Sequence, residues 1–474
     1  MEVSKILFKY LGYFALIIIV QSCSVQTKPL NLSPDIDESF FSEGELAQSA
    51  QWWLAFEDEQ LNELIALGLQ QNQSLRASLA NVNRAKASLG ISQSKKYPDL
   101  NLTAGTNTDI EKLDGADTAY VGFTTSWELD VWGQIAALEQ KATWDLEAKK
   151  ALYKARANSV AGAISTAWFG WLAEVDKQRL FADQHKRTSS ALKVINRRFA
   201  LGKNSITDIW QQQRLLESIV AQQAVNDARL AIYRKQLALW AGVKNSDLPQ
   251  LTKASLPQIS GLPKMGLPIQ ILQFRPDIQQ AYANLQASNA SLAAASTERF
   301  PRLSLRANYS TNKNSVKDLF DDWSGSLISS LAMPIFDAGA IQSKIKQQEY
   351  QLEASFADYK QTWFDAIFDV EKSLITEQQL AKVADNISLQ MGLAKKTERV
   401  ISMKYLNGKS NYLNLLKAQE TSLNLERQVV DAQFTLINNR ISLYRELSHG
   451  DFAQESDKEK QTDFSAKTII DENT

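Results

Sequence analysis

Acidic residues gather at two places where acid–base chemistry would be conceivable. Glu57-Asp58-Glu59 follows a run of aromatic residues, and Asp321-Asp322 stands in a polar segment. General acid–base catalysis needs partner groups within hydrogen-bond reach, and neither run has them beside it in the sequence. The chain also lacks G-x-S-x-G, Walker and H-E-x-x-H motifs. We therefore interpret these carboxylates as solvated loop residues. We expect no enzymatic activity, so a partner must supply any energy.

Composition limits metal, disulfide and nucleic-acid chemistry. The histidines are His185 and His449, and the single cysteine is Cys23. A transition-metal site needs several such ligands, so we expect no metal and no cofactor. A lone cysteine has no disulfide partner within the chain. The 52 basic and 53 acidic residues give a formal charge of −1, which argues against a nucleic-acid partner because a basic excess is usual there.

The N-terminus has the pattern of an export signal. Two lysines precede the apolar run Leu11–Val20, which is about half as long as a membrane-spanning helix, and Cys23 follows shortly after. The residues before Cys23 resemble a bacterial lipobox, although Gln21 is atypical there. We predict a lipoprotein-type signal peptide over 1–22, lipidation of Cys23 and a tether over 23–50. The alternative is a buried N-terminal helix with an incidental cysteine.

The chain repeats itself at an offset of 203 to 206 residues. Leu75–Leu102 matches Ile278–Leu305, and the pairs Tyr97-Pro98 and Phe300-Pro301 coincide. A repeat this long indicates a duplicated structural unit rather than a short solenoid period. We predict repeat 1 over 51–242, a Pro-rich linker over 243–270, repeat 2 over 271–449, and a disordered tail over 450–474.

Each repeat contains a pair of strands and a pair of long helices. Apolar and polar residues alternate over about 99–108 and 119–131, and again over 301–311 and 323–336, which predicts strands of period two. A single helix is predicted from Leu61 to Tyr97, before Pro98. Proline-free helical segments follow each strand pair, interrupted only by Gly-containing turns at Gly202 and Gly408. Helices of roughly 100 Å cannot fit inside an ordinary globular domain, so they predict a rod.

Four strands are too few to close a membrane barrel, for which about eight is the minimum. If the strands meet lipid, several copies must share one wall: two copies give eight strands and three give twelve. Val121, Phe123, Trp127 and Leu129 would then meet acyl chains, and Gly122, Thr124, Ser126 and Glu128 would meet water. The alternative is a soluble layer of hairpins with an ordinary coiled coil.

Several motifs resemble the outer-membrane efflux protein family, in its TolC-like, OprM/NodT-type lipoprotein branch. They are Trp53-x-x-Phe56-x-Asp58-x-x-Leu61, Trp127-x-Leu129-Asp130-x-Trp132-Gly133, Phe274-Arg275-Pro276-Asp277-Ile278, Phe300-Pro301-x-Leu303-Ser304-Leu305 and Pro334-x-Phe336-x-x-Gly339. The resemblance covers about 50–448. It implies a mainly α fold with membrane β-strands, in which duplicated halves contribute 4 strands per protomer to a 12-stranded trimeric β-barrel. Long antiparallel helices form a periplasmic α-barrel, with a mixed equatorial region.

The resemblance also implies a role and partners. The chain would be the outer-membrane channel of a tripartite efflux system, a homotrimer passively conducting small molecules. It would work with a periplasmic membrane-fusion adaptor and an inner-membrane RND-type transporter, and would be anchored in outer-membrane lipid. The alternatives are a type I protein-secretion duct and a periplasmic coiled-coil scaffold lipoprotein without a pore.

Three groups of site residues follow from the resemblance. Adaptor contacts are expected at the helix tips: Phe199, Leu201, Gly202, Lys203, Tyr405, Asn407, Gly408 and Lys409. A periplasmic entrance constriction is expected at Asn414, Lys417 and Asp208, where the family's aspartates are absent from the second tip. Membrane-interface aromatics are expected at Trp127, Trp132 and Trp323. The alternative interpretations are plain interhelical loops at the tips and solvated helix residues at the constriction.

Overall fold

The computed structural model of this chain describes residues 51–107, 118–252, 255–259, 269–313 and 318–448. The predicted signal peptide, Cys23, the tether and the C-terminal tail lie outside the described residues. The chain divides into two compact units. Unit 1 contains Ala80–Ala151 and Gln279–Thr362, and unit 2 contains the described residues up to Leu79, Leu152–Ile278 and those from Trp363 onward.

The same order of elements occurs twice along the chain. The first series comprises η1 (Trp52–Phe56), α2 (Glu59–Gln71), α3 (Gln73–Ser94), β1 (Asp99–Asn107), β2 (Thr118–Leu129), α4 (Gln134–Ala200) and α5 (Ile206–Ala241). The second comprises η2 (Ile269–Phe274), α6 (Pro276–Thr297), β3 (Arg302–Lys313), β4 (Ser324–Ala332), α7 (Ala340–Leu406) and α8 (Tyr412–Glu446). Helices α4 and α7 each contain 67 residues.

The helix expected from Leu61 to Tyr97 is broken at Asn72, so that prediction was wrong. Asn72 ends α2 with an extended backbone. Its side-chain oxygen accepts hydrogen bonds from the backbone N–H groups of Ser74 (2.9 Å) and Leu75 (3.1 Å), which caps the start of α3. Its side-chain amide donates to the Trp240 carbonyl at 2.8 Å. Asn72 thus caps the break locally and also contacts distant α5.

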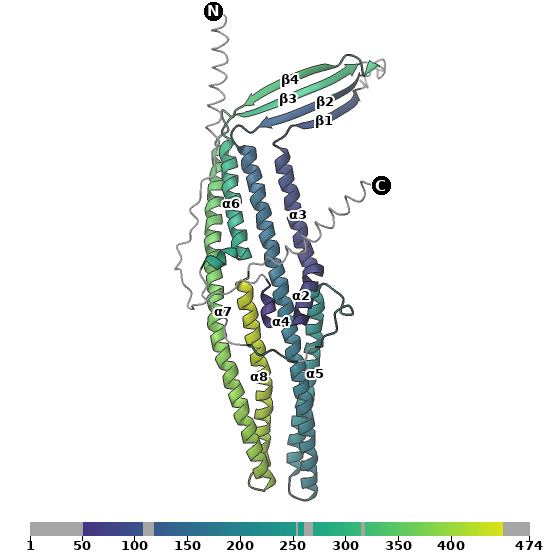
Figure 1. Ribbon diagram of the computed structural model, residues 1–474, viewed down its shortest axis with the longest axis vertical. Coiled ribbons are helices and arrows are strands. Elements are labelled where there is room, and N and C mark those ends of the chain that lie inside the picture. Colours follow the sequence, from purple (N-terminus) through teal and green to yellow (C-terminus); the bar gives the residue numbers. More distant parts are fainter. Residues whose placement is uncertain (1–50, 108–117, 253–254, 260–268, 314–317, 449–474) are drawn as a thin grey trace, which may run out of the picture. The chain divides into compact units, whose positions relative to one another are not determined.

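Unit 1 contains one antiparallel sheet in the order β1-β2-β3-β4 (Figure 1). β4 ends at Ala332, before Pro334, rather than continuing to Phe336 as expected from the alternation, because proline lacks the N–H that a ladder needs. Each strand pair returns to its long helix through an aspartate. Asp130 accepts hydrogen bonds from Ile135 and Ala136, and Asp337 accepts them from Gly339 and Ile341. The two halves thus use the same local device.

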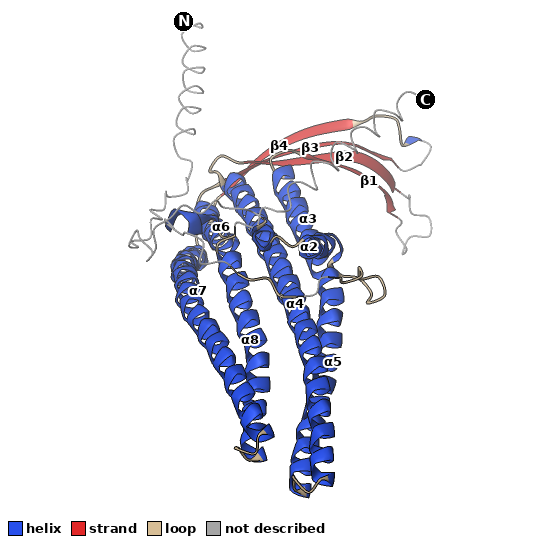
Figure 2. Cartoon of the chain, turned by 60° about the horizontal axis from the view of Figure 1, so that its bottom comes forward, coloured by secondary structure: helices blue, strands red, loops and turns tan. Residues whose placement is uncertain are grey.

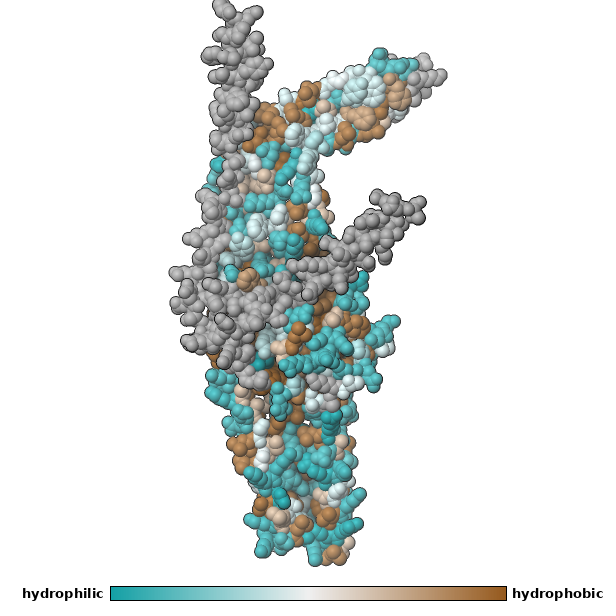
Figure 3. All heavy atoms as spheres, viewed as in Figure 1, coloured by the Kyte–Doolittle hydropathy of each residue, from teal (hydrophilic) through white to brown (hydrophobic). Residues whose placement is uncertain are grey.

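The register of the sheet separates its two faces. Phe123 lies opposite Leu102 on one side and Tyr309 on the other, whereas Ser126 lies opposite Asp99 and Arg306. One face is therefore mainly apolar, and the other is polar. Large apolar side chains remain exposed on the strands, as Figure 3 also shows; they include Leu100, Leu102, Phe123, Tyr309, Leu327 and Leu331.

The core of unit 2 forms around the aromatic residues near the start of the described chain. Trp52, Trp53, Leu61, Trp168 and Phe169 belong to one buried hydrophobic cluster. Figure 2 shows α4 with α5, and α7 with α8, as helical pairs joined by turns. None of the helices in the described ranges is both long enough and apolar enough to cross a membrane.

Asp58 corrects the interpretation of its acidic run as solvated. Its side chain is only 2% exposed. One carboxylate oxygen accepts a hydrogen bond from the N–H of Leu61 and caps α2, and the other accepts the indole N–H of Trp168 at 2.9 Å. Asp58 therefore holds the start of α2 against α4, which the sequence alone did not indicate.

Candidate functional site

The turn between α4 and α5 is a tight helix ending built around Gly202. The N–H of Gly202 donates to the Phe199 carbonyl (2.8 Å), and the N–H of Lys203 donates to the Arg198 carbonyl (2.8 Å). This pair of bonds is a Schellman motif, which needs a left-handed residue at the position of the glycine. Gly202 has φ +69° and supplies that conformation. The motif fixes the direction in which the tip turns.

The turn between α7 and α8 repeats the same arrangement. Gly408 has φ +71° and donates to the Tyr405 carbonyl (3.0 Å), while Lys409 donates to the Lys404 carbonyl (2.8 Å). A Cβ added to either tip glycine would meet no atom within 4 Å. The glycines are therefore required by the backbone angle and not by lack of space.

The two helices that follow the turns begin with different caps. Ser205 and Asp208 form a reciprocal capping box at the start of α5, each side chain accepting the other's backbone N–H. At the start of α8, Asn411 accepts the N–H of Asn414 at 3.0 Å. Asp208 and Asn414 thus occupy the same position in the two helices, but only Asp208 closes a box.

A polar and aromatic network joins the two tips. The Arg198 guanidinium lies 4.8 Å from the ring centre of Tyr405 and donates to the side-chain oxygen of Asn204 at 2.9 Å. The Asn204 amide donates to both the Tyr405 hydroxyl and the Asp208 carboxylate. Tyr405 also packs edge-on against Tyr412, with ring centres 5.8 Å apart. The second tip is thus held against the first.

The network continues into the buried interior between the helical pairs. The Tyr412 hydroxyl donates to Gln212, whose amide donates to the Thr188 carbonyl at 3.0 Å. Burial raises the pKa of Tyr412 above its ordinary value, so the phenol remains a neutral donor at physiological pH.

The predicted tip residues divide into two classes. Tyr405 is buried and Gly202 and Gly408 shape the backbone, whereas Phe199, Leu201 and the two turn lysines are exposed. Leu201 is 71% exposed. Further apolar side chains missed by the sequence reasoning are exposed near the tips: Ile206, Trp210, Leu406 and Leu413. The surface available to a partner is therefore more apolar than predicted.

The predicted entrance residues lie close to these caps. Asn414 and Lys417 are exposed in the first turns of α8. Asp208 is half-buried, and its carboxylate accepts hydrogen bonds from Ser205 and Asn204. Asp208 consequently has a structural task in addition to any role at an entrance.

The predicted interface aromatics lie on β2, in the connection from β2 to α4, and in the segment just before β4. Trp127 donates to the Lys96 carbonyl (3.0 Å), and Trp132 stacks on Phe300 and donates to the Pro301 carbonyl (2.7 Å). Trp323 precedes β4 and stacks on Tyr309, with ring centres 5.0 Å apart. Trp127 and Trp323 are thus found at opposite ends of the strands.

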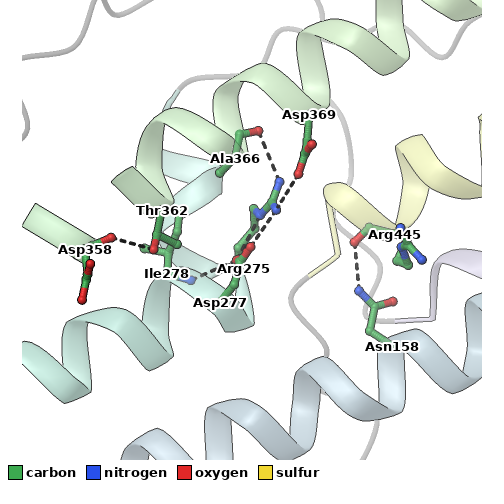
Figure 4. Close-up of polar contacts among 9 residues, drawn as sticks. All are labelled: Asn158, Arg275, Asp277, Ile278, Asp358, Thr362, Ala366, Asp369 and Arg445. Atoms are coloured by element: carbon green, nitrogen blue, oxygen red, sulfur yellow. Dashed lines mark hydrogen bonds and ion pairs between the residues drawn. The ribbon is translucent and has the colours of Figure 1, made fainter. Parts of the chain in front are cut away.

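A polar cavity in unit 2 surrounds a motif to which the sequence reasoning gave no role. Arg275 donates two hydrogen bonds to Asp277 and one to the Ala366 carbonyl, and lies 3.6 Å from Asp369 (Figure 4). These residues border a cavity of about 540 Å³, which Arg445 and Glu446 of α8 also line. Only the fold brings these segments together.

Glu446 is the unusual group of this cavity. One of its carboxylate oxygens is buried and has no hydrogen-bond partner. Burial, reinforced by the nearby Asp369 and opposed by Arg275 and Arg445, raises the pKa of Glu446 to about 7. Among the side chains described, no three His, Cys, Asp or Glu residues are grouped as a metal site would need.

Comparison with known proteins identifies the family. The family model for outer membrane efflux proteins matches residues 64–242 and 267–449. The solvent efflux pump outer membrane protein SrpC of Pseudomonas putida is 28% identical over 413 residues, covering 83% of this chain and 86% of SrpC. The cation efflux system protein CusC of Escherichia coli O157:H7 is 26% identical over 413 residues, covering 85% of this chain and 89% of CusC.

The fold agrees with this match. The open-state MtrE outer membrane channel of Neisseria gonorrhoeae superimposes with a TM-score of 0.80 at 24% identity, covering 90% of this chain and 98% of MtrE. Both halves of the chain, with their strand pairs and long helices, lie inside the matched ranges. The chain therefore belongs to the outer membrane efflux protein family.

Proposed function

We propose that three copies of this chain enclose one pore in the outer membrane, and that this pore is the exit duct of a tripartite efflux pump for small molecules. The chain's own part is passive conduction. A periplasmic adaptor and an inner-membrane transporter of the RND type would deliver the cargo and supply the energy. The observation that carries the proposal is an amphipathic four-stranded sheet with two open edges.

The open edges call for neighbouring copies. Within the sheet described, β1 and β4 each pair with one strand only. Lipid does not tolerate unpaired backbone groups, so a membrane-inserted sheet must close into a barrel. Four strands from each of three copies would give twelve, which is an ordinary size for such a barrel.

The two faces of the sheet match a barrel wall. The apolar face would meet acyl chains, and the polar face, with Asn101, Thr124, Ser126 and Ser310, would meet water. Trp127 and Trp323, at opposite ends of the strands, suit the aromatic girdles at the two membrane surfaces. In a soluble hairpin layer, this much apolar surface would face water, which is unfavourable.

Helix α7 offers a second surface for a neighbouring copy. Phe368, Ile375, Leu389 and Met403 are exposed and recur at multiples of seven residues. Such spacing forms the seam of a helical pair with a 3.5-residue repeat. Packing of this seam against an adjacent copy would continue the barrel as a helical tunnel.

The helix tips are the proposed contact with the adaptor. Leu201 and Phe199 present apolar surface there, and Lys203 and Lys409 add positive charge. Farther along α8, exposed Asn414 and Lys417 are the proposed lining of the entrance. Cys23 is the proposed site of a lipid anchor.

We propose no narrower class of exported molecule, because the relatives are named for the efflux of different kinds of molecule. SrpC is named for solvent efflux and CusC for cation efflux, and a wide passive duct has little means of selecting among small solutes. The proposal therefore places the choice of cargo in the inner-membrane pump.

The pore is tested with a matched pair of adjacent substitutions in β4. Leu327 is 76% exposed on the apolar face, and Ser326 lies beside it on the polar face. An arginine facing lipid near the middle of the membrane costs about 2–4 kcal/mol. Leu327→Arg should therefore reduce membrane insertion and export, whereas Ser326→Arg should retain both.

The full-length protein would be purified in detergent, and its mass and its conductance in planar bilayers measured. Trimers with large steady conductance are expected for the unaltered chain and for Ser326→Arg. A monomer without conductance would contradict the proposal and favour the scaffold lipoprotein. Equal insertion of both variants would contradict the assignment of the faces.

A further inference from the structure

Charged residues are distributed very unevenly on the four strands. The strands contain five of them: Asp99 on β1, Glu128 on β2, and Arg302, Arg306 and Lys313 on β3. The register places Asp99, Ser126 and Arg306 in one row across the sheet, and Glu128 opposite Ser304. Four of the five charges therefore lie on the polar face; Lys313 alone lies on the other.

The four charges are also confined to one end of that face. Asp99 begins β1 just after α3, Glu128 is the next-to-last residue of β2, and Arg302 begins β3 after α6. Beyond them, toward the loops, the polar face contains uncharged residues such as Thr103, Thr124 and Ser310. We call Asp99, Glu128, Arg302 and Arg306 the charge belt.

The members of the charge belt are accessible to solvent and are not neutralised by one another. All four side chains are exposed, and Asp99, Glu128 and Arg302 border one cavity of about 450 Å³. Asp99 accepts hydrogen bonds from Ser126, and within the described chain neither Arg302 nor Arg306 belongs to an ion pair. With β2 between their strands, Asp99 and Arg306 are about 10 Å apart, close to the screening length at 0.1 M salt.

We infer that the charge belt sets the ion selectivity of the pore, with Arg302 and Arg306 favouring anions and Asp99 and Glu128 opposing them. This inference rests on the proposed trimeric pore, in which the polar face lines the lumen. Two arginines and two carboxylates per copy balance, so the wall as a whole should discriminate weakly between small ions. Removing either pair would leave a ring of like charges, which concentrates counter-ions in a water-filled channel.

The matched control is the fifth charged residue. Lys313 is on the opposite face of β3 and forms an ion pair with Asp322 at 2.9 Å. Lys313→Gln removes a positive charge from the same strand, yet it should leave the ratio of cation to anion permeability unchanged. The double variant Arg302→Gln/Arg306→Gln should raise that ratio roughly threefold or more at 0.1 M salt.

The experiment measures reversal potentials of the full-length protein in planar bilayers under a KCl gradient. Asp99→Asn/Glu128→Gln should lower the permeability ratio, which provides an independent test if the arginine variant assembles poorly. Pores with an unaltered ratio in both double variants would overturn the inference while leaving the proposed pore intact. An equal shift in Lys313→Gln would also overturn it, because the face would then be irrelevant. Absence of any pore would refute the proposed function itself.

Discussion

Replacing Glu446 with glutamine should make the protein more stable at neutral and alkaline pH. Glu446 lies near the end of α8 in the cavity that Arg275 and Asp369 also border. Its buried carboxylate oxygen lacks a donor, so ionisation has to occur without a compensating hydrogen bond at that atom. A neutral amide of nearly the same shape removes the buried charge.

The size of the effect follows from the pKa. The pKa of Glu446 is raised from 4.5 to about 7 by burial. At 1.36 kcal/mol per pKa unit, the difference corresponds to at most about 3 kcal/mol. Between pH 4.5 and 7 the folded state retains a proton that the unfolded state has released. The contribution of Glu446 is therefore most favourable below pH 4.5 and is lost as the pH rises through 7.

Burial contributes most to the raised pKa of Glu446, and a hydrogen bond from Ser373 and the charged neighbours on each packed element modify it. Asp369 on α7 raises the pKa, whereas Arg275 before α6 and Arg445 on α8 lower it. Asp277 is held by Arg275 in two hydrogen bonds, and Lys372 lines the same cavity. We expect Glu446 itself to account for the change in stability between pH 5 and 8.

The assay is thermal unfolding of the detergent-solubilised protein, followed by helical circular dichroism from pH 5 to 8. The difference in midpoint between Glu446→Gln and the unaltered protein should grow as the pH rises. Glu217→Gln, at an exposed position on α5, serves as the control and should show a constant difference. A Glu446→Gln difference that is the same at pH 5 and pH 8 would refute the reasoning.

Two further sets of substitutions test the local structure. Asp58→Ala should lower the free energy of unfolding by about 3 kcal/mol, because it removes a helix cap and leaves the fully buried Trp168 indole N–H without an acceptor. Denaturant titration measures this loss, and exposed Glu59→Ala is the control. A loss no greater than that of Glu59→Ala would contradict the role of Asp58. Gly202→Ala and Gly408→Ala should each lower the free energy of unfolding by about 1 kcal/mol because of the positive φ at these positions. Gly392→Ala inside α7 should instead raise the free energy of unfolding by up to about 1 kcal/mol. The same thermal assay compares the three variants. If all three shifted the unfolding midpoint in the same direction, backbone conformation would be excluded as the cause.

Sequence patterns predicted the elements that are determined by residues close together in the sequence. The period-two alternation indicated the strand pairs, the absence of proline indicated the long helices, and Gly202 and Gly408 indicated the turns; the structure contains all of these. The helix break at Asn72 was missed because its side-chain amide bonds to Trp240, 168 residues away. Burial of Asp58 was missed for the same reason, since Trp168 is 110 residues away.

The cavity around Glu446 shows where sequence reasoning reaches its limit. Arg275, Pro276 and Asp277 were recognised as a motif, but their partners lie on α7 and α8. A raised pKa depends on desolvation and on charges from several elements, and of the charges around Glu446 only Arg445 is adjacent to it in the sequence. Composition and periodicity therefore do not predict that these segments contact one another.

The caps at the helix tips, where the duplicated halves touch each other, differ between the halves. Helix α5 begins with a reciprocal capping box, whereas the cap of α8 lacks the returning bond that Asp208 provides in α5. In compensation, Tyr405 and Tyr412 of the second half contact Asn204 and Gln212 of the first. Because a cap contributes about 1 kcal/mol and a buried hydrogen bond a similar amount, the first tip can be ordered by its own residues. The second tip has its own turn at Gly408 and its own cap at Asn411, and the contact with the first half adds to these in holding it in place.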